Sequence, residues 1–318
     1  MDRNLALDFI RVTEAAAMAS ARWVGKGEKE KADDAAVEMM RKTFAKMDID
    51  GTVVIGEGER DEAPMLYIGE KIGSGKGFGV DIAVDPVEGT NSVAYGRPNA
   101  IAVLAASPKG TMLHAPDTYM DKIAVGPQAH GQVSLEGDVA YNIEQTAKAL
   151  DKKPKDITVV VLDRERHNDL IKDIRKCDSR IVIIKDGDVS GAISPSIPDN
   201  EIDMLLGVGA APEGVLAAAA IACTGGYMEG RFKFRDDDDR KRAEGMGVKK
   251  LDEIMHMKDM LDCDKAIFAA TGITTGSFLK GVRFTKEGAE THSVVMRSRT
   301  KTVRYVEGHH KFEDEPEY

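Results

Sequence analysis

The sequence has few residues able to form disulfides or soft-metal sites. Its three cysteines, Cys177, Cys223 and Cys263, lie far apart and form no Cys-x-x-Cys pair. No histidine stands at ligand spacing from any of them, so we expect reduced thiols. The seven histidines are scattered and include no His-Glu-x-x-His motif, which argues against a zinc site.

Aromatic residues and positive charge are also scarce. Aromatic residues make up 5% of the chain, and 44 Lys and Arg face 54 Asp and Glu, giving a net charge of −10. No basic stripe with interleaved aromatics is present. This balance argues against nucleic acid as a partner. An anionic substrate would need local cations or metal ions to bind against the overall charge.

Long apolar runs are absent. The best candidate, "VLAAAAIACT", is much shorter than the roughly 18 residues needed to span a membrane. The start, "MDRNLALDFI", has no basic segment followed by an apolar one, so we expect no secretory signal. We therefore expect a cytoplasmic protein with no membrane partner. With 318 residues, 42% of them hydrophobic, the chain can form one large domain or two lobes with substantial cores.

The periodicity of apolar residues predicts helices and strands in alternation. In the first half of the chain, this periodicity predicts helices over 5–24 and 33–47, and strands over 51–59, 79–86 and 100–107. The second half continues with strands over 157–163, 180–188, 201–210 and 265–273, and helices over 166–176 and 212–222. Such alternation is typical of βαβ units and a partly parallel sheet.

The order of elements predicts an α/β protein with two lobes. "DKKPKDI" near 151–157 suggests the boundary, which gives lobes over 1–156 and 157–318. The stretch 282–306 reads as antiparallel strands that close the second lobe. The sequence shows no internal repeat and no low-complexity linker.

Two motifs resemble ligand loops and fail on inspection. "GSGKGFG" at 73–79 has Glu70 where a phosphate-binding loop has its first glycine, and a strand follows it. "RDDDDR" at 235–240 lacks the order of aspartates and glycine of a calcium loop. We expect the first to be a turn and the second to be the acidic start of an exposed helix.

One strand ends in a group of polar residues, "VDIAVDPVEGT" at 80–90. Alternation places Asp81 and Asp85 on one face, and Pro86 is expected to end the strand because it has no N–H to donate. Glu88, Gly89 and Thr90 then follow at the turn. Strand ends are where α/β proteins usually bind ligands. The alternative is a plain Asx turn with Thr90 as a helix cap.

Other carboxylates stand at the ends of predicted elements. Glu57 and Glu59 follow the strand that begins at 51, Asp33 opens a helix, and Glu213 follows Pro212 at another helix start. Each has an ordinary alternative: a solvated loop, an N-cap, or a favourable helix-dipole position. Clustered carboxylates without His or Cys suit Mg²⁺ or Mn²⁺. Paired ions of this kind stabilise phosphoryl transfer, so we hypothesise metal held over a phosphate.

These motifs resemble the metal-binding core of the lithium-sensitive phosphatase superfamily. "VIGEGERDEAPMLYIGE", "VDIAVDPVEGT", "APDTYM", "KDGDVSGAI", "GVGAAPEG" and "FAATGIT" look like class II fructose-1,6-bisphosphatase, in the same order and over nearly the whole chain. Inositol monophosphatases usually carry Asp where Glu88 stands, and a later Trp-Asp-x-Ala motif. The only tryptophan here is Trp23, which disfavours that activity.

The resemblance implies roles at the matching positions. Its implied metal ligands are Asp33 and Glu57 for one ion, and Asp85, Glu88 and Glu213 for a second. Its implied catalytic residues are Thr90, which would orient or activate the attacking water, and Glu57 and Glu59. Its implied substrate-binding residues are Lys29, Glu88, Gly89 and Thr90 for the transferred phosphate; Tyr119, Asp186, Gly187, Asp188 and Ala210 for the sugar; and Arg164, Glu165 and Arg166 for the remote 6-phosphate end.

Two departures from the family pattern concern substrate fit. The family often has Gly-Gly-Ala before the late Pro-Glu-Gly, whereas this chain has Gly209-Ala210-Ala211, and the methyl group of Ala210 could crowd the sugar. Glu165 stands where relatives often have proline. It adds negative charge beside the implied phosphate site, so its side chain is expected to point away.

The resemblance implies a layered αβαβα sugar-phosphatase fold, with the metal site between two α/β lobes. It implies Mn²⁺- or Mg²⁺-dependent hydrolysis of the 1-phosphate of fructose 1,6-bisphosphate, as in gluconeogenesis, by a homo-oligomer (dimer or tetramer). One alternative is dual activity on sedoheptulose 1,7-bisphosphate, as in some photosynthetic bacteria. An alternative of another class is a non-catalytic sugar-phosphate sensor, against which the intact Asp85, Glu88 and Thr90 argue.

Overall fold

The computed structural model describes residues 5–57 and 66–312 and divides the chain into two compact units. The first unit combines Met1–Met112 with Lys265–Tyr318, and the second is Leu113–Asp264. The predicted division after residue 156 differs from this, because it falls inside the second unit. The physical reason is strand pairing: the last strands of the chain hydrogen-bond to strands of its first third, and so return to the first unit.

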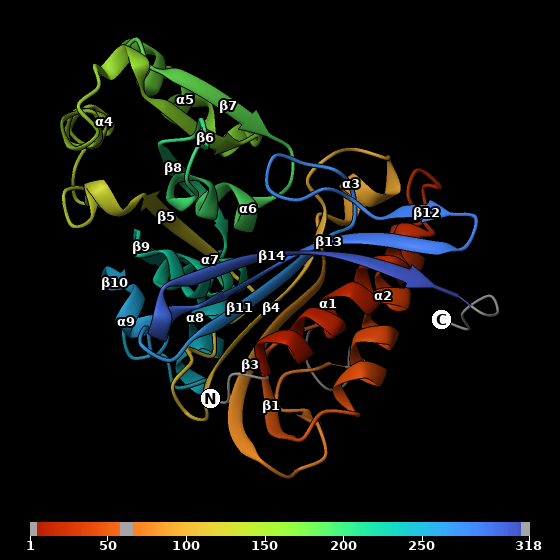
Figure 1. The fold of residues 1–318 in the computed structure, drawn as a ribbon. Coiled ribbons are helices and arrows are strands. Elements are labelled where there is room, and N and C mark those ends of the chain that lie inside the picture. Colours follow the sequence, from red (N-terminus) through yellow and green to blue (C-terminus); the bar gives the residue numbers. More distant parts are fainter. Residues whose placement is uncertain (1–4, 58–65, 313–318) are drawn as a thin grey trace. The chain divides into compact units, whose positions relative to one another are not determined.

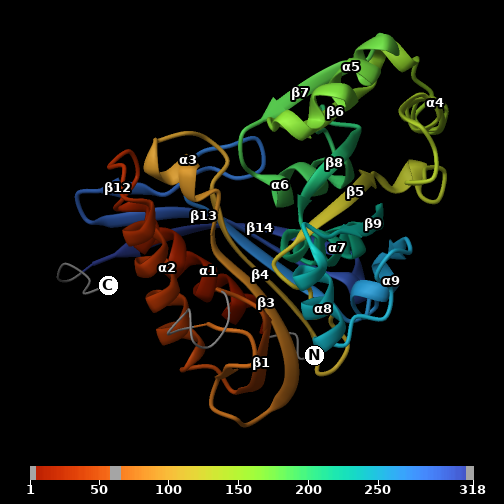
Figure 2. The same ribbon diagram turned by 180° about the vertical axis from the view of Figure 1, so that it is seen from behind.

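The first unit is a mixed sheet covered by two long helices (Figures 1 and 2). Its described elements are α1 (Leu5–Ala21), α2 (Lys29–Phe44), β1 (Ile49–Ile55), β2 (Lys71–Ile72), β3 (Phe78–Glu88), α3 (Thr90–Ala94), β4 (Ile101–Pro108), β11 (Ile267–Gly272), β12 (Arg283–Thr285), β13 (Gly288–Arg297) and β14 (Thr302–Lys311). The strand order is β12-β13-β11-β4-β3-β1-β2, and β14 also pairs with β13. Only β1 and β3 run parallel among these pairs.

The core of the first unit lies between α1, α2 and this sheet. Phe9, Val12 and Ala16 recur at three- and four-residue spacing on α1 and are fully buried. On α2, Met40 and Phe44 do the same, and the two helices pack side by side. Burying a side chain of this size contributes about 1.5–3 kcal/mol. The sequence prediction of two amphipathic helices is confirmed, with α2 beginning four residues earlier than expected.

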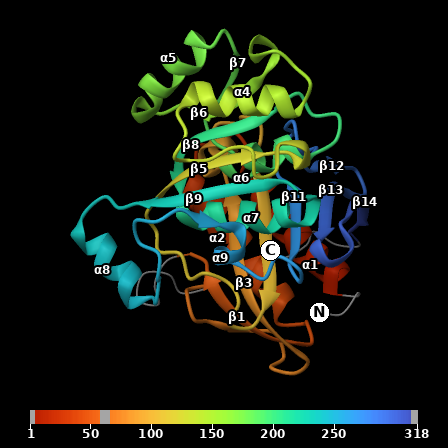
Figure 3. The ribbon, with the colours of Figure 1, turned by 90° about the vertical axis from the view of Figure 1, so that its left-hand side faces the viewer.

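The second unit has three layers, which Figure 3 shows with α4 and α5 on one side of the sheet and α7 on the other. Its described elements are β5 (Tyr119–Val125), α4 (Val139–Ala149), β6 (Thr158–Leu162), α5 (Asn168–Lys176), β7 (Arg180–Ile184), α6 (Asp188–Ile193), β8 (Met204–Ala210), α7 (Ala211–Thr224), β9 (Tyr227–Lys233), α8 (Asp237–Gly245), β10 (Met255–His256) and α9 (Met257–Met260), with short 3₁₀ turns at 127–129, 154–156, 165–167 and 194–196. The strand order is β10-β9-β5-β8-β6-β7.

The connections of the second unit follow the predicted alternation. Strand β6 runs parallel to both β7 and β8, and helices join these strands. The "RDDDDR" segment forms the acidic first turn of α8, as expected, with Asp236 as its N-cap. The two sheets and their covering helices confirm the mixed α/β class. In the part of the chain that is described, no helix is both long enough and apolar enough to cross a membrane.

Strand β3 continues past the proline that was expected to end it. Asp85 pairs with Val103 and Glu88 pairs with Ile101, so three steps along β3 match two steps along β4. This is a β-bulge with one extra residue, and the N–H of Val87 donates to Asp85 Oδ1 at 3.0 Å instead of to the ladder. A bulge is one of the few places where a strand accepts proline. The prediction that the strand ends at Pro86 is therefore wrong.

Candidate functional site

The carboxylates of the first unit gather at one edge of its sheet. Because β1 and β3 run parallel, with Ile55 in register with Ala83, Glu57 and Asp85 both lie two residues beyond this matched pair. Asp33 is the fifth residue of α2, not its N-cap, and its side chain hydrogen-bonds to Glu57. Residues far apart in sequence are thus brought to the carboxyl ends of adjacent parallel strands.

The contact between Asp33 and Glu57 is electrostatically unfavourable when both are ionised. The pKa of Asp33 is raised to about 6, mainly by burial and next by the neighbouring charge of Asp34, while the hydrogen bond from Glu57 acts in the opposite direction. Lys29 lies one helical turn before Asp33 on α2. Its side chain is half exposed, and its Nζ lies 4.0 Å from Glu30 Oε1. Lys29 is therefore the basic residue that α2 places one helical turn from this carboxyl pair.

The bulge in β3 sets the next group of side chains. Asp85 is half-buried at the start of the bulge, and Glu88, at its end, is only 4% exposed. Gly89 follows with a φ of 96°, a left-handed conformation that favours glycine. Thr90 is then the first residue of α3. The backbone conformation thus turns the chain sharply between a buried carboxylate and a half-buried hydroxyl.

The oxygen-only donor set of the first unit fits a hard divalent cation. Asp33, Glu57, Asp85 and Glu88 offer carboxylate oxygens alone, which Mg²⁺ and Mn²⁺ prefer. A cation between Asp33 and Glu57 would relieve their mutual repulsion. Across residues 5–57 and 66–312, however, no three acidic, histidine or cysteine side chains converge closely enough to form a metal group. Glu59 lies outside the described residues.

In the second unit, the predicted sugar-binding residues lie around β8. Tyr119 of β5 is in register with Ala210, the last residue of β8. The guanidinium of Arg166 lies over the Tyr119 ring, 4.6 Å from its centroid, and donates to the Val208 carbonyl at 2.8 and 3.1 Å. Tyr119, Arg166 and Ala210 therefore lie close together, although they are far apart in sequence.

Arg164 connects this neighbourhood to the "DGD" loop. Its guanidinium donates to the Lys185 carbonyl at 2.8 Å and contacts Asp186 at 3.3 Å. Gly187 takes a φ of 98° before α6 begins at Asp188. Glu165, between the two arginines, is exposed. Its charge is therefore screened by water, which limits the repulsion expected near a phosphate.

Glu213 is the one predicted metal ligand that belongs to the second unit. It lies in the first turn of α7, after Pro212, as expected. Although part of the residue reaches the surface, its Oε2 atom is buried and has no hydrogen-bond partner among the described residues. Burial raises the pKa of Glu213, and the nearby Lys122 opposes this shift. A buried carboxylate oxygen without a donor is consistent with a cation ligand.

Two residues beside the predicted sugar-binding residues of the second unit, Lys122 and Gly209, were not predicted from the sequence. Lys122, on β5, is only 1% exposed, and its ammonium group contacts Asp188 and the Ala210 carbonyl. Gly209 has no room for a side chain, because a Cβ there would lie 1.9 Å from Asp188 Oδ2. Lys122 could have been found from its spacing: it shares a strand face with the buried Met120 and Ala124, where a charge is unusual.

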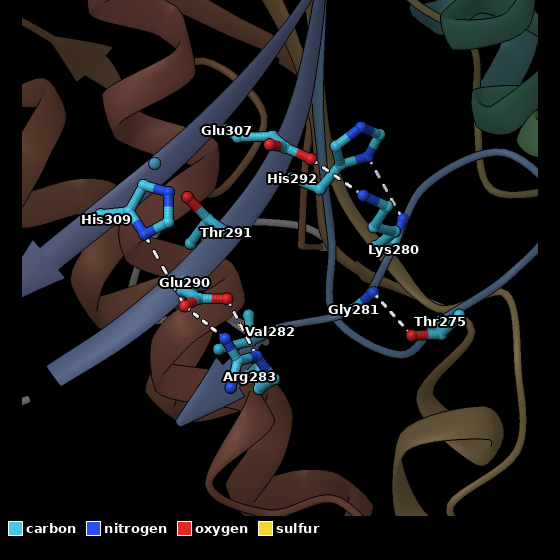
Figure 4. Close-up of a pocket in the computed structure, with 11 residues that line it drawn as sticks. Thr275, Lys280, Gly281, Val282, Arg283, Glu290, Thr291, His292, Glu307 and His309 are labelled. Carbon is cyan, nitrogen blue, oxygen red and sulfur yellow. Dashed lines mark hydrogen bonds and ion pairs between the residues drawn. The ribbon is translucent and has the colours of Figure 1, made fainter. Parts of the chain in front are cut away.

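A separate groove in the first unit contains none of the predicted site residues (Figure 4). It has a volume of about 470 Å³ and lies among β12, β13, β14 and the loop before β12. Its cations already have acidic partners: Lys280 contacts Glu307 at 2.8 Å, and Arg283 contacts Glu290 at 2.9 Å. The groove is balanced in charge, which distinguishes it from the carboxylate edge.

The comparisons with known proteins agree over nearly the full chain. The family model described as "Bacterial fructose-1,6-bisphosphatase, glpX-encoded" matches residues 3–310. The chain is 44% identical to "D-fructose 1,6-bisphosphatase class 2/sedoheptulose 1,7-bisphosphatase 2" of Acaryochloris marina, covering 98% of this chain and 97% of the relative. It is 43% identical to the protein of the same type from a Synechococcus species, covering 98% and 96%. It is also 44% identical to "Fructose-1,6-bisphosphatase 1 class 2" of Escherichia coli, again covering 98% and 96%. The chain therefore belongs to the glpX-encoded family of bacterial fructose-1,6-bisphosphatases.

Proposed function

We propose that this chain hydrolyses the 1-phosphate of fructose 1,6-bisphosphate, giving fructose 6-phosphate and phosphate, as gluconeogenesis requires. The observation that carries the proposal is the carboxylate edge of the first unit, where Asp33 meets Glu57 beside the bulge that holds Asp85 and Glu88. Family membership supports the same reaction. Hydrolysis of a phosphate monoester is among the slowest uncatalysed reactions, so strong charge stabilisation is required.

The proposed cofactor is Mn²⁺ or Mg²⁺. Asp33 and Glu57 would hold one ion, and Asp85 and Glu88 a second. Glu213 belongs to the other unit, so its assignment to the second ion rests on the resemblance, supported by its buried Oε2. When bound, such ions neutralise phosphate charge and lower the pKa of coordinated water.

The proposed catalytic role of Thr90 is to orient and activate the attacking water, with Glu57 and Glu59 beside it. Its position at the start of α3, directly after Gly89, supports this role because the hydroxyl is fixed relative to the bulge. The backbone of Glu88, Gly89 and Thr90 would contact the transferred phosphate. Lys29 would add positive charge, one helical turn from Asp33.

The proposed sugar site comprises Tyr119, Asp186, Gly187, Asp188 and Ala210. Arg164 and Arg166 would hold the 6-phosphate, since planar guanidinium groups bind phosphate oxygens in pairs. The contacts of Arg166 with the Val208 carbonyl and the Tyr119 ring support this, because they fix the orientation of its guanidinium group before substrate binds. A hold on the remote end would orient the reacting end.

A second candidate is dual activity on fructose 1,6-bisphosphate and sedoheptulose 1,7-bisphosphate. The names of the Acaryochloris and Synechococcus relatives, at 44% and 43% identity, favour it. The E. coli relative carries the fructose name alone at 44% identity. Identity therefore does not separate the two. We further propose that the enzyme acts in the cytoplasm as a homo-oligomer, a dimer or a tetramer.

The test is phosphate release by metal-stripped protein, with and without added Mn²⁺ or Mg²⁺. The substrates are fructose 1,6-bisphosphate, sedoheptulose 1,7-bisphosphate and inositol 1-phosphate. Metal-dependent release from the fructose substrate is expected, and the sedoheptulose rate decides the dual candidate. Binding of a sugar phosphate without release from any substrate would overturn the proposal in favour of a non-catalytic sensor. Size-exclusion chromatography with light scattering tests the oligomer.

A further inference from the structure

Lys122 is a lysine buried in the interior of the second unit. Its residue is 1% exposed, between Met120 and Ala124 on the face of β5 that packs against α7. The fit is close, since a Cβ on Gly214 of α7 would lie 3.4 Å from the Lys122 side chain. Burying an ammonium group costs several kcal/mol unless partners compensate for the lost water. The buried ammonium group of Lys122 must therefore have partners that offset this cost.

The partners of Lys122 are two residues assigned to sugar binding. Its Nζ donates to Oδ2 of Asp188, at the start of α6, and to the carbonyl oxygen of Ala210 at 2.8 Å. Asp188 is itself only 8% exposed. One buried cation thus joins the "DGD" loop to the end of β8.

The space around this contact is fixed by a glycine. A Cβ at residue 209 would lie 1.9 Å from Asp188 Oδ2 and 2.8 Å from Lys122 Nζ. Gly209 lets the backbone of β8 approach the ion pair closely. The ammonium and carboxylate therefore have little freedom to rearrange.

We propose that Lys122 is a positioning residue for substrate binding, holding Asp188 and the Ala210 peptide in the orientation that the sugar requires. With Oδ2 bound to the ammonium, Asp188 presents Oδ1 as the acceptor for a sugar hydroxyl. The substrate then meets an acceptor whose orientation is already fixed. Lys122 itself does not touch the sugar. This inference rests on the proposed function, because that function assigns Asp188 and Ala210 to the substrate.

A purely structural role for Lys122 would have a different signature. A buried ion pair can serve folding alone, and breaking it by removing one partner then lowers stability without a selective effect on binding. The chain offers a matched pair: Lys152 Nζ contacts Asp203 Oδ1 at 2.6 Å in the same unit, and Asp203 is 7% exposed. None of the predicted site residues takes part in that pair. Replacing Lys152 therefore measures the loss of stability that follows when a buried aspartate outside the proposed site loses its lysine partner.

The experiment compares K122M, K152M, D188A and K122M/D188A with the wild type. It measures KM and kcat for fructose 1,6-bisphosphate, the Kd for fructose 6-phosphate by calorimetry, and Tm. We expect K122M to raise KM and Kd by about 10- to 100-fold, since small misplacement of binding groups has effects of this size. We expect K152M to lower Tm while leaving KM and Kd unchanged. In the double variant the two effects should combine to much less than their product, because Lys122 acts largely through Asp188.

Unchanged KM and Kd in K122M would overturn the proposal, as would effects of K122M and D188A that multiply in the double variant. If K122M does not fold, K122M/D188N is compared with D188N, because the double variant leaves no isolated buried carboxylate. Equal KM values for these two support the proposal, and a further large rise in the double variant overturns it.

The two proposals fail in distinguishable ways. A wild type that binds fructose 6-phosphate but releases no phosphate would overturn the proposed reaction, while the Kd series would still test Lys122. A wild type with neither turnover nor binding would overturn both. Turnover in the wild type with equal KM values for K122M and K152M would overturn the role of Lys122 alone.

Discussion

Asp33 in the first unit and Asp188 in the second unit are carboxylates with opposite neighbours. Asp33 hydrogen-bonds to the carboxyl group of Glu57 and has the negative charge of Asp34 beside it, so its neighbours are acidic groups. Asp188 is bound by the buried ammonium of Lys122. The neighbours that shift the pKa of Asp33 are thus acidic, whereas Asp188 is paired with a buried cation.

This difference indicates separate roles for the two groups, one in metal binding and one in substrate binding. A site of like charges gains most from a cation taken from solution, which makes it suited to metal binding. A site with its own cation is fixed by the fold and is suited to orienting a substrate. The Asp33–Glu57 pair would then depend on metal taken from solution, whereas Asp188 would be oriented by the fold itself.

Metal removal tests this division most strongly. Chelation should reduce kcat/KM for fructose 1,6-bisphosphate by about 10³-fold or more, since bound metal supplies several kcal/mol of transition-state stabilisation and each 1.36 kcal/mol is a factor of ten. The Kd for fructose 6-phosphate, measured by calorimetry, should change little. Added Mn²⁺ should restore turnover. A parallel loss of product binding would contradict the division.

Thr90→Ala should affect the chemical step and spare metal binding. We expect kcat to fall by about 10²- to 10⁴-fold, the range for loss of a group that positions or moves a proton. The metal affinity, measured by calorimetry, should stay the same. Thr43→Ala is the control, since the Thr43 hydroxyl donates to the Met39 carbonyl within α2 and Thr43 is not among the predicted site residues. An unchanged kcat in the Thr90 variant would remove Thr90 from the mechanism.

Arg166→Ala should affect substrate binding in the second unit. We expect KM for the bisphosphate to rise by about 10- to 100-fold, because hydrogen bonds to charged groups contribute about 1.5–3 kcal/mol. The kcat value at saturating substrate should change less. Arg180→Ala, on exposed β7 of the same unit, is the control. If KM is the same in both variants, Arg166 does not hold the remote phosphate.

The Asp239→Asn variant tests how much a buried carboxylate that is bound by an arginine contributes to stability, and how that contribution depends on pH. Hydrogen bonds from Arg235 hold the pKa of Asp239 well below its usual 3.8, opposite in direction to the shift at Asp33. Because the folded pKa is below the unfolded one, this stabilisation is present above about pH 4 and is lost as the pH falls below it. At pH 7 the variant should lose about 1.5–3 kcal/mol of unfolding free energy, and the difference should shrink in acid.

Urea unfolding at pH 7 and pH 3 measures this effect. Asp252→Asn is the matched control, because Asp252 also pairs with an arginine, Arg240, but is exposed on the surface. Exposed pairs contribute about 0–1 kcal/mol, so this variant should change little. If both variants lose the same free energy at pH 7, burial of the Asp239 carboxylate is not what gives that pair its strength.

Several features of the fold were predictable from local pattern. The amphipathic spacing of Phe9, Val12 and Ala16 indicates α1, and the acidic run at 236–239 indicates the start of α8. These elements follow from periodicity and capping, which act within a few residues. The continuation of strand β3 past Pro86 could not be predicted from local pattern, because a bulge depends on the partner strand β4, which the local sequence does not specify.

The sequence by itself determined the kinds of element, the family and the chemical types available: carboxylates for hard cations, arginines for phosphate. Tertiary structure alone decided which of them meet. It returned residues 265–318 to the first unit, joined Asp33 to Glu57, and buried Lys122 between Asp188 and Ala210. The physical reason is that strand pairing and burial connect residues far apart in sequence, and the cost of burying a charge is set by neighbours that only the fold assembles.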